Sequence, residues 1–122
     1  FTMKVVNVKY VKCDAYIGRP NKTHSSVYTI FGNPYTHLTG HTNAKFVVAT
    51  RDEAVDKYRE YFLDRLLTDE YFFNCFMCLV ENLNIETLGC HCAPLRCHGD
   101  ILAEMITLYR KEMKLEVKQN VE

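Results

Sequence analysis

The sequence has no excess of either charge, because its 15 Lys and Arg residues are matched by 15 Asp and Glu residues. Proteins that bind nucleic acid without sequence preference usually present a basic surface. The composition therefore argues against generic nucleic-acid binding, while a local basic pocket stays compatible with a neutral chain.

Long apolar runs are also absent. The longest candidate is YFFNCFMCLV (Tyr71–Val80), which is about half of the roughly 20 residues that a membrane-spanning helix needs and contains Asn74. The opening stretch FTMKVVNVKY lacks the apolar segment of a secretory signal, and we interpret Phe1 and Thr2, which precede Met3, as a cloning remnant. We therefore expect no membrane partner and a cytoplasmic location.

Apolar and aromatic residues are plentiful. Hydrophobic residues make up 48% of the 122-residue chain, which carries 8 Tyr and 7 Phe. A chain of this size and composition can bury a core and should fold rather than stay disordered. No internal repeat or low-complexity segment interrupts it. We expect a single domain over residues 3–118.

The six cysteines lie mostly in apolar helical or strand patterns. Without an export signal, free thiols in a reducing compartment are the better interpretation, and we predict no disulfide. Cys75 and Cys78 form a Cys-x-x-Cys pair, but they lie within the apolar stretch NCFMCLV. Packing explains that pair better than zinc or redox chemistry does.

Short β-rich runs dominate the first part of the chain. Residues 3–10 and 13–18 are predicted strands, and VYTIF (27–31) is predicted as a third short strand before the turn signal GNP. A later run, 87–92, places Leu88, Cys90 and Cys92 on one face if it is extended.

Three helices are predicted in the second half. Thr50 and Glu53 form a capping box that opens a helix over TRDEAVDKYREYFLDRLL. Thr68 is predicted as a second N-cap, followed by a helix over residues 70–83 that is apolar nearly all round. A third helix is predicted from the N-cap Asp100 to about Lys111.

The order of these elements predicts an α/β or α+β fold. We expect one compact domain in which a mixed β-sheet is packed by about three helices. The strand over residues 87–92 should be interior, with the third helix packed on the sheet.

The stretch LGCHCAPLRCHGD, which spans residues 88–100, is the richest in functional side chains. One hypothesis is a zinc site made by Cys90, Cys92, Cys97 and His98. Two ligands at positions i and i+2 of a regular strand lie roughly 7 Å apart, so one metal could reach both only if the strand bends. We therefore predict no stoichiometric metal and keep zinc as the alternative.

A second hypothesis is a pocket where this strand passes through a loop into a helix. Ligands in open α/β sheets bind beyond the carboxyl ends of strands, and a helix N-terminus favours an anion. Other side chains expected at strand ends or helix starts would join the pocket. The predicted ligand-binding residues are Gly18, Arg19, Asn33, Arg51, Cys92, Cys97, His98 and Asp100.

Within this pocket we expect an anion between Arg19, Arg51 and the start of the third helix, with Asn33 orienting a polar group. A cation such as Arg51 in the first turn of a helix opposes the helix dipole, which is tolerable if a ligand uses it. Two neighbouring arginines without a carboxylate beside them would repel each other unless a bound dianion compensates their charges.

A third hypothesis makes Cys97 a nucleophile assisted by His98, because a helix N-terminus lowers a thiol pKa. The alternative for Cys90 and Cys92 is that they are small core residues. His24, His37 and His41 occupy loops and are interpreted as surface residues.

Several motifs together resemble the family catalogued as domain of unknown function 4326. They are YIGRP, VYTIFGNPY, TRDEAVDKYREYFLDRL and LGCHCAPLRCHGDILAEMI, and they extend over about residues 7–106. His91 departs from the pattern, in which this position is often aromatic. The resemblance implies a bacterial, bacteriophage or viral origin and no particular activity. It also implies a signature of Gly18, Arg19, Asn33, Pro34, Arg51, Cys90, Cys92, Cys97, His98 and Asp100.

Three functions follow as hypotheses. The first is binding of a small anion, such as a nucleotide or phosphorylated metabolite, which a phage protein could sequester in the host cytoplasm. The second is a zinc-stapled module that binds a host protein. The third is a nucleotide or glycosyl hydrolase or transferase that depends on Cys97 and His98.

Overall fold

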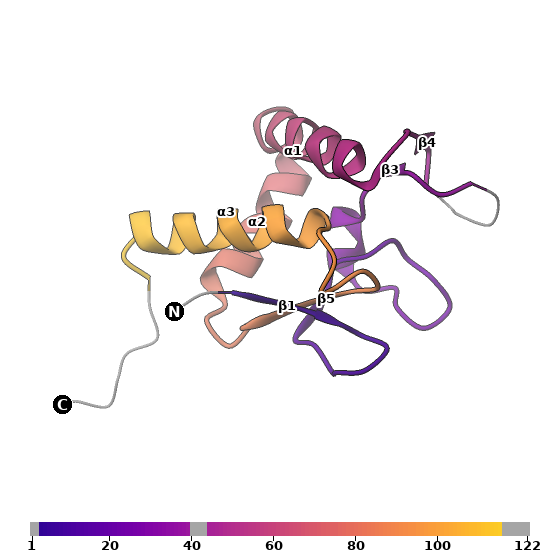
Figure 1. Cartoon of the computed structure of the whole chain (residues 1–122). Helices are drawn as coiled ribbons and strands as arrows, with labels where there is room; N and C mark the ends of the chain where they lie inside the picture. The colour runs from indigo at the N-terminus through magenta and orange to yellow at the C-terminus, as the bar shows by residue number, and fades with distance from the viewer. Residues whose placement is uncertain (1–2, 40–43, 116–122) are drawn as a thin grey trace.

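The computed structural model describes residues 3–39 and 44–115 (Figure 1). The predicted domain end at 116–118, the interpreted remnant 1–2 and His41 lie outside these ranges. The elements, in chain order, are β1 (Lys4–Asn7), β2 (Ala15–Tyr16), the 3-10 helix η1 (Val27–Phe31), β3 (Tyr35–Thr36), β4 (Phe46–Val47), α1 (Arg51–Thr68), α2 (Glu70–Glu81), β5 (Thr87–Cys90) and α3 (His98–Glu112).

The main sheet has three strands in the order β1-β5-β2, so β5 is interior as predicted. Helix α3 packs on β1 and β5, while α1 and α2 pack against α3 (Figure 1). This confirms a single α/β domain with three helices. The expectation of a mixed sheet is wrong for the described strands, because β1 and β2 both pair with β5 in parallel. The pair β3 and β4 forms a second, smaller parallel sheet.

Parallel pairing places the carboxyl ends of β1, β5 and β2 at one edge of the sheet. The connection from β1 to β2 must then return across β5. It does so over Gly89, where a Cβ would meet Cys13 Sγ and lie 2.6 Å from Val8 Cγ1. Residue 89 is therefore glycine because a side chain at this position would collide with the connection from β1 to β2.

The cap of α1 was predicted correctly. Thr50 Oγ accepts a hydrogen bond from the Glu53 N–H at 3.0 Å, and the Glu53 carboxylate accepts one from the Ala49 N–H at 3.1 Å. The buried face of α1 consists of Ala54, Val55, Tyr58 and Phe62. The Tyr58 hydroxyl donates to the Phe31 carbonyl at 2.7 Å, which ties α1 to η1.

Two helix boundaries differ from the prediction. Thr68 is the last residue of α1, where its hydroxyl bonds the Asp64 carbonyl, and Asp69 caps α2 instead. Asp100 is not the N-cap of α3, because the helix begins one turn earlier with Cys97 as the cap. At α2 the Asp69 carboxylate accepts a hydrogen bond from the Phe72 N–H, whereas at α3 the Asp100 carboxylate accepts one from the Cys97 N–H from within the first turn.

Two further expectations are corrected. The segment VYTIF is the 3-10 helix η1, not a strand, because the N–H groups of Thr29 and Gly32 bond back to carbonyls three residues earlier. Helix α2 packs against the core as predicted, but one side of it, with Tyr71, Asn74 and Cys78, is exposed. The packing interpretation therefore holds for the buried Cys75 but not for Cys78.

A buried arginine joins α3 to the end of α2. Arg110 on α3 is only 4% exposed. Its guanidinium group donates hydrogen bonds to four carbonyls at and beyond the end of α2, those of Leu79, Val80, Asn82 and Ile85. These bonds satisfy carbonyls that a helix end leaves free.

All six cysteines carry free thiols, as predicted. Within residues 3–39 and 44–115, no helix has the length and apolar character needed to cross a bilayer.

Candidate functional site

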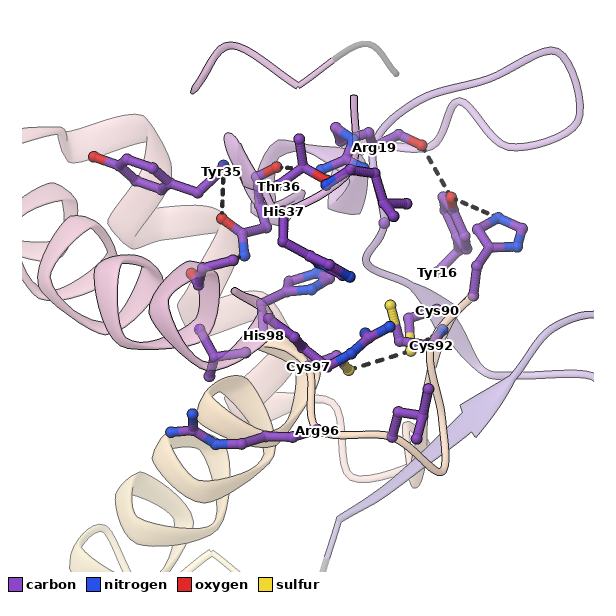
Figure 2. A pocket seen from close by; sticks show the side chains of 18 of the residues that line it. Tyr16, Arg19, Tyr35, Thr36, His37, Cys90, Cys92, Arg96, Cys97 and His98 are labelled. Atoms are coloured by element: carbon purple, nitrogen blue, oxygen red, sulfur yellow. Dashed lines mark hydrogen bonds between the residues drawn. The ribbon is translucent and has the colours of Figure 1, made fainter. Parts of the chain in front are cut away.

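A cavity of about 370 Å³ lies at the carboxyl ends of β2 and β5, between the starts of α1 and α3 (Figure 2). Parallel pairing brings the strand ends together, and the loops after them carry the lining side chains. Seven of the eight predicted ligand-binding residues line this cavity: Gly18, Arg19, Asn33, Arg51, Cys92, Cys97 and His98.

Asp100 is the exception, because it is exposed and does not line the cavity. Its carboxylate instead accepts a hydrogen bond from the Cys97 N–H at 3.1 Å. The residue therefore stabilises the start of α3 and occupies a donor that a bound anion would otherwise use.

Asn33 lines the cavity, but both ends of its amide are engaged by the protein. Its Nδ2 donates to the Ala54 carbonyl at 3.1 Å, and its Oδ1 accepts from the Tyr35 N–H at 2.9 Å. Asn33 thus joins η1 and β3 to α1. These two hydrogen bonds give Asn33 a role in positioning the cavity wall.

Arg19 enters the cavity from the end of β2. Its Nη1 donates to the Asn33 carbonyl, and its backbone lies against Gly32, where a Cβ would come within 2.8 Å of Arg19 Cα. Burial lowers the pKa of Arg19, and the nearby Cys92 opposes that effect. The guanidinium group keeps its charge, since arginine is not deprotonated in proteins.

Arg19 and Arg51 differ from the third arginine of the cavity. Arg96 lies at the rim and pairs with Asp52 at 2.9 Å and Asp56 at 3.0 Å. In the part of the chain that the structure describes, neither Arg19 nor Arg51 forms an ion pair with a carboxylate. No carboxylate among the described residues compensates their charges inside the cavity.

The sulfur atoms of Cys90, Cys92 and Cys97 lie close together at the cavity (Figure 2). Cys90 Sγ and Cys97 Sγ are 3.4 Å apart, and the Cys92 N–H donates to Cys90 Sγ at 3.4 Å. Cys90 and Cys97 are buried, whereas Cys92 is half-buried. We call Cys90, Cys92 and Cys97 the thiol trio.

Contacts within the thiol trio favour ionisation of one of its three thiols. Hydrogen bonding to the Cys90 and Cys97 thiols, followed by hydrogen bonding and attraction to Arg51, lowers the pKa of Cys92 well below its ordinary value. Hydrogen bonding within the trio and burial raise the pKa of Cys97 strongly, and the pKa of Cys90 also rises. Cys92 is therefore the thiol of the trio whose ionisation its surroundings favour, and Cys97 is not.

His98 is a buried, neutral histidine. Its Nε2 lies 2.8 Å from the Ile17 carbonyl, which can only accept, so this nitrogen carries the proton. Burial is the main cause that lowers the pKa of His98. The Tyr58 ring packs edge-on against it, with centroids 5.0 Å apart. His98 thus links α3 to the end of β2.

The lowered pKa of His98 predicts a loss of stability in acid. Below about pH 6.5, the unfolded chain binds a proton at this residue that the folded chain does not. The free energy of unfolding should then fall with decreasing pH by up to about 1.4 kcal/mol per pH unit. His98→Gln, which keeps an amide donor, should flatten this slope in urea titrations from pH 5 to 7. Parallel profiles for the two proteins would contradict the assignment.

Several residues of the site were not anticipated. Tyr16 donates from its hydroxyl to the Arg19 carbonyl at 3.0 Å, and His91 Nε2 lies 3.1 Å from the same hydroxyl. His24 is not a simple surface residue, because its ring stacks on Tyr16 with centroids 4.0 Å apart. His37 lines the cavity. No local pattern marks the contact between His91 and Tyr16, since it joins segments 75 residues apart in sequence.

The zinc alternative finds no support in this arrangement. Among residues 3–39 and 44–115, no group of three His, Cys, Asp or Glu side chains is placed to hold a metal ion. The fourth proposed ligand, His98, uses Nε2 to bond the Ile17 carbonyl.

The chain belongs to the family described as Domain of unknown function (DUF4326), which it matches over residues 3–108. A search of curated proteins and a search of solved structures each found no match.

Proposed function

We propose that this protein binds a small anionic ligand in the cavity, of the type of a nucleotide or a phosphorylated metabolite. The observation that carries the proposal is the presence of Arg19 and Arg51 in one cavity, without an acidic ion-pair partner among the described residues. Arginine binds phosphate through charge-assisted and often bidentate hydrogen bonds.

The shape and lining of the cavity agree with a ligand larger than phosphate alone. Its volume of about 370 Å³ lies at the lower end of the range for small-molecule sites. Tyr35, Leu38, Val55 and Leu95 supply apolar surface on its walls. A molecule with a charged group and a less polar body, such as a nucleoside monophosphate, would use both parts.

Calorimetric titration of the full chain tests the proposal with three probes. A nucleoside monophosphate should bind more tightly than inorganic phosphate, and the matching uncharged nucleoside should bind weakest. Equal affinity for nucleoside and nucleotide would contradict a role for the arginines, and binding of none of several such pairs would contradict the ligand class.

A second candidate function is thiol-dependent turnover of the ligand by a hydrolase or transferase reaction. The favouring observation is that Cys92 borders the cavity beside Arg51. In this candidate the nucleophile is Cys92. Cys97, the nucleophile hypothesised from the sequence, is only 3% exposed. Turnover of a nucleotide that Cys92→Ser abolishes, while its binding persists, would support it.

The expected cytoplasmic location belongs to the same proposal, because six free thiols suit a reducing compartment. Binding of a host protein gains no support from any surface described above.

A further inference from the structure

Three neighbouring thiols are the groups that disulfide chemistry needs, and anion binding does not use that chemistry. Its sulfur atoms are packed as neighbours, with Cys90 Sγ and Cys97 Sγ in contact at 3.4 Å. A disulfide needs about 2.05 Å between sulfur atoms, so a modest side-chain rotation would suffice to form a bond. All three cysteines line the cavity, and Cys92 is the most exposed of them, since Cys90 and Cys97 are buried.

We propose that the thiol trio is a site of reversible oxidation, in which a hydroperoxide oxidises Cys92 and a disulfide then joins Cys97 to the strand-end pair Cys90 and Cys92. Three features of the geometry carry this proposal: the position of Cys92 on the cavity wall, the Cys90 and Cys97 thiols that hydrogen-bond to its side chain and contact each other, and the guanidinium of Arg51 that also bonds it. The proposal does not depend on the identity of the anionic ligand.

The first step is a two-electron oxidation of sulfur. The Cys92 thiolate attacks one oxygen of the hydroperoxide, an S–O bond forms and the O–O bond breaks. The product is Cys92 sulfenic acid, and the released alkoxide or hydroxide takes up a proton to become an alcohol or water. A cation beside the sulfur favours the thiolate that this step needs.

The second step forms the disulfide. The Cys97 sulfur attacks the Cys92 sulfur, an S–S bond forms and the S–O bond breaks. The hydroxide leaves and takes the thiol proton, giving water. Cys90 is the last residue of β5, and its sulfur already contacts Cys97 Sγ at 3.4 Å. Exchange with the adjacent Cys90 thiol can then move the bond to the pair Cys90 and Cys97.

The order of residues in the chain makes the product simple to detect. Trypsin cleaves after Arg65, Arg96 and Arg110 and at no residue between them, so Cys97 falls in peptide 97–110. Cys75, Cys78, Cys90 and Cys92 all fall in peptide 66–96. A disulfide from Cys97 to either strand-end cysteine therefore joins these two peptides.

The experiment treats the full, folded chain with about one equivalent of hydrogen peroxide at pH 7, blocks the remaining thiols by alkylation and maps the tryptic peptides. We expect peptides 66–96 and 97–110 to be linked through Cys90 or Cys92, and dithiothreitol to reverse the link. Cys92→Ser should slow the linkage at least about ten-fold, because the reactive thiolate is gone. Cys78→Ser removes an exposed cysteine on α2 and should leave the rate unchanged.

Two outcomes would overturn the proposal. One is oxidation of wild-type Cys92 to sulfinic acid without a link to Cys97. The other is reaction of Cys78 at the same rate as Cys92. Both are read from the wild-type protein, so the proposal stays testable even if Cys92→Ser does not fold.

Discussion

Replacing Arg51 by glutamine is expected to weaken binding of a phosphate-bearing ligand by roughly 10- to 150-fold, or about 1.5–3 kcal/mol, the range for hydrogen bonds to a charged group. The side chain lines the cavity, is half-buried and has no acidic ion-pair partner among the described residues. Its loss should therefore remove ligand contacts and barely change the melting temperature. Calorimetric titration and thermal denaturation of the same preparation measure both effects.

The matched control is Arg59→Gln on the same helix, α1. Arg59 is paired with Glu104 at 3.0 Å and does not line the cavity. An exposed pair of this kind contributes little to stability, so neither affinity nor melting temperature should change appreciably. Arg19 is a less selective choice, because it also holds the Asn33 carbonyl. Equal losses of affinity in the Arg51 and Arg59 variants would contradict a specific anion site.

Replacing Arg110 by methionine is expected to lower the free energy of unfolding by about 3–5 kcal/mol, although this residue is far from the cavity. Methionine can fill much of the volume but cannot donate to the four carbonyls that Arg110 bonds. A buried acceptor left without a donor costs about 1–3 kcal/mol, and local relaxation recovers part of that loss. Urea denaturation measures the change.

The neighbouring Lys111→Met variant is the control for this prediction. Lys111 is exposed on the same helix, and exposed substitutions of this kind usually change stability by less than about 0.5 kcal/mol. A loss below about 1 kcal/mol for Arg110→Met would mean that water or neighbouring groups satisfy these carbonyls.

The parts of the fold that were predicted correctly rest on local signals. The hydroxyl of Thr50 and the carboxylate of Glu53 act within a few residues, so their spacing alone predicts the start of α1. The apolar run before Cys90 and the helical spacing from Ile101 likewise predict β5 and α3.

The errors in the fold arise where tertiary contacts decide between local alternatives. VYTIF has the composition of a strand, but it packs against α2 and β2 as a helical turn, and Tyr58 of α1 bonds the Phe31 carbonyl. The direction of β2 could not be predicted either, because its sequence does not show whether the connection from β1 passes back over Gly89 of β5. The result is a parallel sheet where a mixed one was expected.

The sequence could predict that the site residues lie close together, but it could not predict the role of each residue. Residues that follow parallel strands meet at one edge of a sheet, which places Arg19 near the loop after β5. Whether Asn33 or Asp100 faces a ligand depends on which backbone groups lie within its reach. Which thiol has the lowered pKa, Cys92 or Cys97, depends on hydrogen bonds within the thiol trio, on burial and on Arg51, and the motif LGCHCAPLRCHG displays none of these.

The most direct test of the anion site is nuclear magnetic resonance of the 15N-labelled chain titrated with a nucleoside monophosphate. The account predicts saturable shifts at the amides of Gly18, Arg19, Arg51 and His98, all from residues that line the cavity. Thr107 and Lys111, which line a separate groove between β1 and α3, should not shift. Shifts that gather in that groove, or that leave the cavity residues unchanged at saturating ligand, would contradict it.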